Sequence, residues 1–271
     1  MSATEDDPTP PDSGAGVPMT LTELRDSVRR VLGAEIPLGE PIWLSRFRTQ
    51  ARHAERYRDR RVFLAGDAAH LFPAGGTALN TGMLDTVNLA WKLAAAVHGW
   101  APDDLLDTYH RERHLAGARA LMQTRAQAAL ARGHDADVIA LRALFQELLT
   151  DEQPLQRIAA MLTGTDTHAP QPRPVDHPLT GTFVPNLPLR TADGATTVAE
   201  LMRNGQPLLI DLGNHPNLRA TARQWRQRID IHTATTDHRP ADALLIRPDA
   251  QIAWAAHTHQ STASPSHYAR H

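Results

Sequence analysis

Apolar residues recur at helical spacing through most of the chain up to about residue 162. Thr20 and Glu23 form a capping-box sequence, which predicts a helix that begins there and ends at Gly33. Apolar and basic positions follow helical intervals over residues 103–132, which predicts one long helix. Two further helices are predicted at residues 136–149 and 154–162.

A strand-like pattern interrupts these helices. Residues 62–65 form a short apolar run closed by Gly66, which predicts a buried strand. Asp67 follows at the carboxyl end of that strand, and a loop then leads to a helix predicted to start near Asn80. Residues 41–57, before the strand, are expected to be extended.

The pattern changes again after residue 162. Residues 163–188 are dense in Pro, Thr and His, which is typical of an extended linker between domains. Beyond it, apolar runs alternate with helical patterns, which predicts a βαβ unit. The expected helices are 197–203 and 218–228, and the expected strands are 207–212, 229–233, 243–247 and 251–256.

We therefore predict an α/β (α+β) chain in which long helices precede a small α/β domain. The first residues are rich in Pro, Gly and acidic side chains with little to bury, so we expect them to be disordered. The predicted segments are a disordered start at 1–18, a first domain at 19–162, a linker at 163–184, a second domain at 185–257 and a flexible tail at 258–271.

Composition removes several classes of function. The net charge of −2 offers no basic field for nucleic acid or an anionic membrane. The chain has no cysteine, which excludes disulfides, thiol redox chemistry and thiolate metal sites. No apolar run approaches the ~18 residues of a membrane span, and the acidic, Pro-rich start is unlike a secretory signal, so we expect a cytoplasmic protein.

Two histidines have the spacing of metal ligands. His110 and His114 are four residues apart on one face of a predicted helix. No cysteine and no carboxylate in register accompany them. We therefore expect a solvated basic face there and no metal site.

The stretch around Asp67 carries the chemistry. An acidic residue after a strand, a Gly-rich loop and a helix N-terminus together predict a site for an anionic, hydroxyl-bearing ligand. The glycines of the loop let the backbone approach that ligand closely. An ordinary strand–loop–helix unit, whose glycines serve packing, is the alternative.

These residues closely resemble the second flavin-binding segment of the FAD-dependent aromatic hydroxylases, the class A flavoprotein monooxygenases, and in particular the aromatic polyketide hydroxylases and rifampicin-type monooxygenases. Gly66 and Asp67 match the family's GD motif, and residues 73–80, PAGGTALN, match its P-x-G-G-x-G-L-N loop. Ala78 departs from the family's usual glycine. Residues 43–47, WLSRF, match the end of its substrate-domain sheet, and residues 185–257 resemble its thioredoxin-like end, here without cysteines.

The resemblance implies FAD as cofactor, NAD(P)H as reductant and an aromatic polyketide-like small molecule as substrate. It implies that Asp67 bonds the ribityl hydroxyls and that Pro73 lies at the reactive edge of the flavin. Arg46 lies near the ring in such an arrangement, although a surface arginine is an equal alternative. The expected cofactor-binding residues are Gly66, Asp67, Pro73, Gly75, Gly76, Thr77, Ala78, Leu79 and Asn80.

The GxGxxG segment that opens a family member, which holds the ADP half of FAD, does not occur in this sequence. Three interpretations stay open. The chain is part of a split or truncated FAD monooxygenase, with a partner chain that carries the GxGxxG half or with copies of itself. Alternatively, it is a non-redox cyclase or pericyclase on the same scaffold, or a binding or assembly subunit. Flavin absorbance of the purified protein separates the first interpretation from the others.

Overall fold

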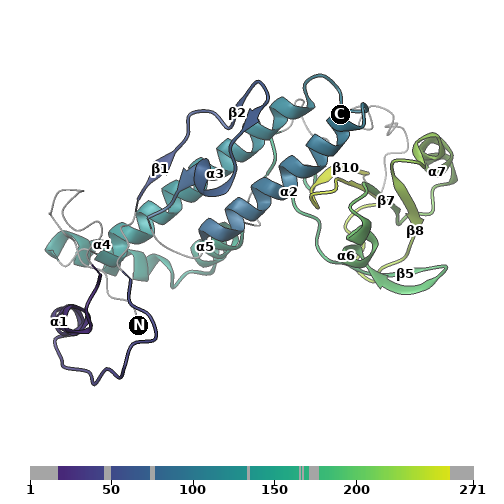
Figure 1. The fold of residues 1–271 in the computed structure, drawn as a ribbon. Coiled ribbons are helices and arrows are strands. Elements are labelled where there is room, and N and C mark those ends of the chain that lie inside the picture. The colour runs from purple at the N-terminus through teal and green to yellow at the C-terminus, as the bar shows by residue number, and fades with distance from the viewer. Residues whose placement is uncertain are drawn as a thin grey trace.

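The computed structural model describes residues 18–45, 50–73, 77–132, 135–164, 166, 168–170 and 177–256. A helical part is followed by a part built around a four-stranded sheet (Figure 1). The helices of three turns or more are α1 (Leu21–Leu32), α2 (Thr77–Val97), α3 (Leu105–Arg132), α4 (Ala136–Leu148) and α5 (Glu152–Thr163). The shorter helices are η1 (Gly66–Ala68), α6 (Val198–Leu201), η2 (Met202–Asn204), α7 (Pro216–Ala222) and η3 (Arg223–Trp225).

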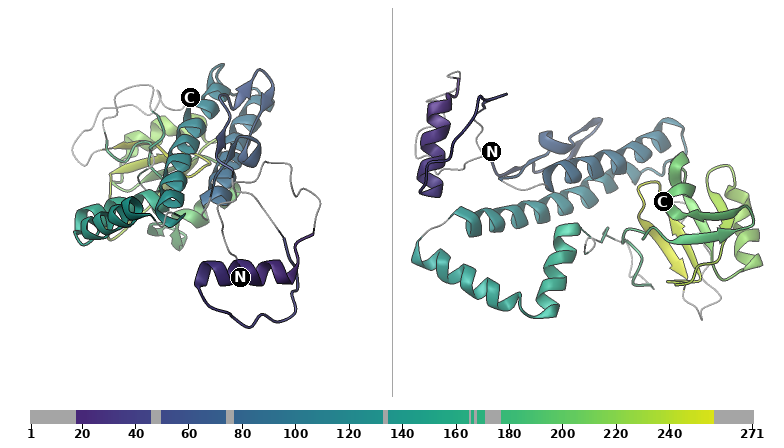
Figure 2. Two further views of the ribbon diagram at one scale, coloured as in Figure 1. Left: turned by 90° about the vertical axis from the view of Figure 1, so that its left-hand side faces the viewer. Right: turned by 90° about the horizontal axis from the view of Figure 1, so that it is seen from below.

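The helices begin and end close to their predicted bounds because local signals set them. The Thr20 side chain accepts a hydrogen bond from the Glu23 N–H at the start of α1, and Gly33 closes the helix with a φ of 67°. α2 begins at Thr77, earlier than the predicted start near Asn80. The first turn of a helix needs no core-facing apolar residue, so periodicity gives no signal there. α1 lies apart from the C-terminal sheet in the views of Figures 1 and 2.

α2 and α3 form the centre of the helical part. They pack along each other as an antiparallel pair, joined by a short turn in which Gly99 adopts a φ of 72° (Figure 2). α4 and α5 follow α3 in the chain. Within the described ranges, no helix combines the length and the apolarity that crossing a bilayer requires.

Four very short strands lie against the α2–α3 pair. β1 (Arg52–His53) pairs with β4 (His70–Leu71), and β2 (Arg58–Asp59) pairs with β3 (Val62–Phe63), both antiparallel. The prediction of a buried strand at residues 62–65 is wrong in length and burial, since β3 has two residues and Val62 is 63% exposed. Among the described residues β3 pairs only with β2, so Val62 lies in a two-stranded sheet and stays exposed.

The C-terminal sheet contains β7 (Leu208–Asp211), β8 (Asp230–Thr233), β9 (Ala243–Ile246) and β10 (Ile252–Ala256) in the order β10-β9-β7-β8. β7 and β8 are parallel, which confirms the predicted βαβ unit, and the other pairs are antiparallel, with β9 and β10 forming a hairpin. Leu208 and Ile210 join the core on one face, whereas Leu209 joins the core on the other. Every residue of β7 and β9 is buried because both faces are covered.

Two features of this part were not predicted. A hairpin of β5 (Pro188–Thr191) and β6 (Gly194–Thr197) precedes α6, and its Leu189 enters the core. Part of the predicted linker is attached to the sheet, since the N–H of Gly181 donates to the carbonyl of Ile252. The domain boundaries themselves stay a prediction.

Candidate functional site

The predicted GD motif forms a tight turn against α2. Gly66 opens η1 with a φ of 58°, a conformation that favours glycine. A Cβ atom on Gly82 of α2 would lie 3.1 Å from the Cα of Gly66. The two glycines therefore allow the turn and the helix to approach each other closely.

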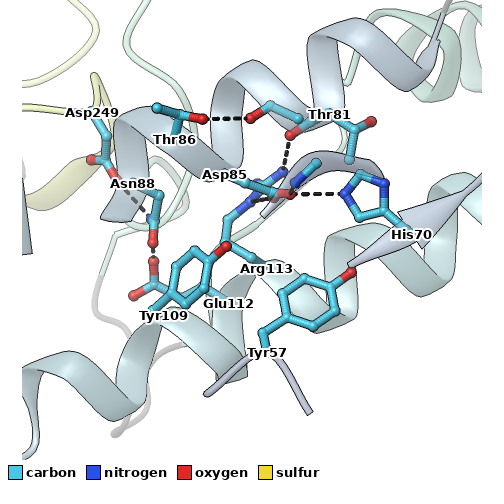
Figure 3. Close-up of polar contacts among 12 residues, drawn as sticks. Tyr57, His70, Thr81, Asp85, Thr86, Asn88, Tyr109, Glu112, Arg113 and Asp249 are labelled. Atoms are coloured by element: carbon cyan, nitrogen blue, oxygen red, sulfur yellow. Dashed lines mark hydrogen bonds and ion pairs between the residues drawn. The ribbon is translucent and has the colours of Figure 1, made fainter. Parts of the chain in front are cut away.

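A buried carboxylate, Asp85 of α2, holds this turn in place (Figure 3). It accepts the backbone N–H of Gly66 at 3.1 Å and lies 2.8 Å from His70 Nε2. It also accepts from Nε of Arg113 on α3 at 2.7 Å, and the same guanidinium reaches the carbonyl of Thr81 at 3.3 Å. These residues, Gly66, His70, Thr81, Asp85 and Arg113, are called the Asp85 network below.

Electrostatics favours an ionised Asp85. Burial alone would raise the pKa of Asp85, but the hydrogen bond to His70 and the guanidinium of Arg113 outweigh it, so its pKa lies below the usual value. A buried, ionised carboxylate with three partners is a rigid support for a turn. The Asp85 network therefore fixes where Asp67 stands.

Asp67 itself lies in η1 and is exposed. Within the described part of the chain, its carboxylate makes no hydrogen bond or ion pair. A free carboxylate on a turn held by Asp85 can accept hydrogen bonds from ligand hydroxyl groups. Asp85 therefore supports the turn, whereas Asp67 is available to bind a ligand.

The remaining predicted site residues fall at the start of α2. Pro73 is buried, and α2 begins at Thr77. Ala78 is half-buried, whereas Leu79 and Asn80 are exposed. The first N–H groups of a helix have no intrahelical partner and carry partial positive charge. Gly75, Gly76 and Arg46 lie outside the described residues.

A second polar network joins α2 and α3 to the C-terminal sheet. Glu112 of α3 accepts from Asn88 Nδ2 at 2.7 Å and Lys92 Nζ at 3.0 Å. Arg247, at the end of β9, donates to the same carboxylate at 2.8 and 3.1 Å. Asp249, in the turn before β10, accepts from Asn88 at 2.8 Å and from Arg247 Nε at 3.0 Å. These five residues are called the Glu112 network.

The side chains of the Glu112 network are strongly charged and largely buried. Burial lowers the pKa of Lys92 to about 8, although the nearby carboxylate of Glu112 opposes the shift. Burial also opposes ionisation of Glu112, but Arg247 and Lys92 lower its pKa to about 2. Glu112 belongs to the Glu112 network and its sequence neighbour Arg113 belongs to the Asp85 network. α3 therefore connects the C-terminal sheet to the Gly66 turn.

His110 and His114 lie in an aromatic cluster. His114 stacks on His53 with ring centroids 4.2 Å apart, and His53 Nε2 lies 2.7 Å from the Tyr57 hydroxyl. His110 and His114 are half-buried, so the predicted face is partly exposed to solvent. Burial and the neighbouring His114 lower the pKa values of His53 and His110. No group of three or more potential ligands in the described residues is placed to hold a metal ion.

Sequence reasoning did not assign a role to His70, Asp85 or Arg113. One signal was present in α2: Thr81, Asp85, Asn88 and Lys92 recur at intervals of four, three and four residues. Polar residues at the spacing of a helix face, within an otherwise apolar helix, indicate a buried polar contact. Their partners on other elements could not be read from the sequence.

Comparison with known proteins agrees with this arrangement. Residues 7–124 match the family described as FAD binding domain, and residues 177–271 match the family described as aromatic-ring hydroxylase, C-terminal. The chain belongs to the FAD-dependent aromatic hydroxylases. This confirms the resemblance found in the sequence and the mixed α/β fold.

Individual relatives match along most of the chain. The dialkyldecalin synthase of Streptomyces rugosporus is 44% identical over 258 residues, covering 93% of this chain and 50% of that protein. The 12-dehydrotetracycline 5-monooxygenase/anhydrotetracycline 6-monooxygenase of Streptomyces rimosus is 40% identical over 246 residues, covering 88% of this chain and 48% of that protein.

A solved structure gives the same result. The anhydrotetracycline hydroxylase OxyS from Streptomyces rimosus superposes with a TM-score of 0.85 at 38% identity, covering 94% of this chain and 53% of that solved chain. The chain thus spans about half the length of the curated relatives it matches.

The described residues fit one end of FAD. A free carboxylate on a fixed turn suits the hydroxyl groups of the ribityl chain, and a helix N-terminus suits a flavin ring that carries negative charge. Both elements meet at the contact between Gly66 and Gly82. The fit concerns the ribityl and ring end, to which the family resemblance assigns the predicted site residues.

Proposed function

We propose that this chain supplies the ribityl- and ring-facing side of the FAD site of an aromatic hydroxylase. The supporting observation is the Gly66 turn, which Asp85 fixes against α2 so that Asp67 stays exposed beside the N-terminus of that helix. FAD, reduced by NAD(P)H, supplies the oxygen chemistry in such an enzyme. The proposed reaction is hydroxylation of an aromatic, polyketide-like molecule with dioxygen.

In this proposal the residues of the chain bind and orient. Asp67 accepts hydrogen bonds from the ribityl hydroxyls. The loop of Pro73, Gly75 and Gly76 borders the ring, and the N–H groups at Thr77, Ala78, Leu79 and Asn80 face the negative charge of the reduced ring. Arg46 is proposed to lie near the ring. None of these residues is proposed to transfer a proton.

The experiment is a titration of FAD fluorescence with the full chain and two variants. Asp67→Asn should weaken binding by roughly 1.5–3 kcal/mol, because it removes a charged hydrogen-bond acceptor. Asp59→Asn is the matched control, since Asp59 is another exposed carboxylate on the neighbouring hairpin. Equal affinity for all three proteins would remove Asp67 from the site.

One observation favours a second candidate. A dialkyldecalin synthase is 44% identical to this chain, and its name describes ring formation. The alternative function is therefore a cyclase or pericyclase reaction in a pocket of the same scaffold. Product formation without NAD(P)H and without oxygen would favour this alternative, whereas dependence on both would favour hydroxylation.

A further inference from the structure

α2 has the reverse of the usual arrangement of a surface helix. Its buried side is polar and consists of Thr81, Asp85, Asn88 and Lys92, followed by Ala95. Its exposed side carries apolar residues along the whole helix, next to the exposed polar residues Asn80 and Thr86. The exposed residues Leu79, Met83, Val87, Ala90, Ala94 and Val97, called the α2 stripe, follow one another at intervals of four, four, three, four and three.

The exposure of the α2 stripe is large. Leu79 is 72%, Met83 56%, Val87 45% and Val97 83% exposed. A surface helix normally turns its apolar stripe to the core, and a long exposed apolar face marks a contact with another polypeptide or a ligand. Because the opposite side of α2 is occupied by the two polar networks, the helix cannot rotate to bury the stripe.

Several observations indicate what covers the α2 stripe. The stripe begins at Leu79, in the segment proposed to face the flavin ring. In the described chain β3 pairs with β2 alone, which leaves one edge of β3 open and Val62 exposed. The chain covers only 50% and 48% of the two relatives compared above, the synthase and the monooxygenase. A second copy would present again the same half that these relatives match.

We propose that the α2 stripe is the docking face for a polypeptide that carries the part of the hydroxylase fold which this chain does not match. The partner presents an apolar face without charges to α2 and adds the ADP-binding side of the cofactor site. The inference deepens the proposed function and rests on it only for the identity of the partner.

The absence of cysteine makes a direct test possible. Single thiols are introduced by Met83→Cys and Val87→Cys in the stripe. Leu144→Cys is the matched control, because Leu144 lies on α4 and is 53% exposed, close to the 56% of Met83. Each full-length variant is produced alone and together with a probe. The probes are the unmatched parts of the Streptomyces rugosporus dialkyldecalin synthase and of the Streptomyces rimosus monooxygenase.

The rate of maleimide modification at each introduced thiol is measured by mass spectrometry. We expect a probe to slow modification at Met83→Cys and Val87→Cys at least tenfold and to leave Leu144→Cys unchanged. Unchanged rates with both probes would overturn the proposal. Protection in the chain alone that grows with concentration, with disulfide-linked dimers of Met83→Cys, would show that a second copy covers the stripe and would also overturn it.

Flavin colour is recorded separately in the same preparations. Thiol protection in a complex that binds no flavin would support the docking face and contradict the proposed function. A yellow complex whose stripe thiols stay reactive would contradict the docking face and support the proposed function.

Discussion

The C-terminal sheet and the Gly66 turn are stabilised in opposite ways. In the sheet, β7 and β9 are buried over their full length, and apolar cores cover both faces. Around the turn the strands have two residues each, and the centre is the ionised Asp85 with its partners. The sheet contains its own apolar core, whereas α2 directs apolar residues outward.

The two regions therefore differ in the source of their stability. A region with a closed apolar core has most of its stabilisation within its own residues. A region centred on a buried ionic network depends on every partner, because an unpaired buried charge is costly. We therefore expect the turn region to be the less stable of the two and to gain most from a docked partner.

The largest expected effect is on the turn region. Asp85→Ala should lower the free energy of unfolding of that region by about 3–5 kcal/mol, because it leaves Arg113 buried without its carboxylate. Hydrogen exchange should rise in η1 and in the first half of α2 while β7 and β9 stay protected. Asp67→Ala, which changes an exposed carboxylate, is the control. A loss below about 1 kcal/mol would show that the Asp85 network does not hold the turn.

Leu244→Ala should have the complementary effect on the sheet. Leu244 is fully buried in the core, so its truncation should cost about 2–5 kcal/mol. Hydrogen exchange should increase in β7, β9 and β10 and should change little at Gly66. Equal increases in both regions would mean that they unfold as one unit, and the comparison would fail.

Acid should act on the contact between the two regions. The pKa of Glu112 is lowered from 4.5 to about 2 in the folded protein, so its stabilisation is fully present above about pH 4.5. It should be lost as the pH falls toward 2, and the loss should be roughly 3 kcal/mol. Urea unfolding between pH 6 and 2, at intervals of about one unit, measures it. Glu112→Gln should flatten the dependence on pH, and an unchanged slope would contradict this role of Glu112.

The smallest effect is expected at a cap. Thr197 and Glu200 form a reciprocal capping box at α6 beside the sheet, so Thr197→Ala should cost about 1 kcal/mol. Thr20→Ala, at α1 far from the sheet, is the matched variant. Thermal unfolding of the sheet should respond to Thr197→Ala alone. A similar response to both would show that α1 is coupled to the sheet.

Local signals in the sequence predicted much of the fold. Thr20 and Gly33 set the ends of α1, and the apolar runs gave the strands from Leu208 to Ala256. The β5–β6 hairpin was missed because the Pro-rich sequence before it favoured a linker, although Asp193 and Gly194 supply a turn. The strand at residues 62–65 was predicted as buried because an apolar run does not reveal which neighbours will cover it.

The site was predicted only as far as neighbours in sequence determine it. The Gly66–Asp67 turn and the start of α2 follow from a contiguous motif. The support from Asp85 joins residues 15 to 28 positions apart, namely His70 and Arg113, and such pairs depend on the packing of α2 against α3. Arg247 lies 135 positions from Glu112, so its contact could not be predicted from spacing.

The burial of Lys92 has a practical consequence for measuring motion. It is the only lysine in the chain, and its Nζ is enclosed between α2, α3 and the turn that carries Asp249. Apart from the amino group at residue 1, no other primary amine can react with an acylating reagent. Acylation of Lys92 therefore requires these elements to move apart. The unmodified protein thus carries its own reporter of that separation, because the rate of acylation rises with the fraction of time for which Lys92 is uncovered.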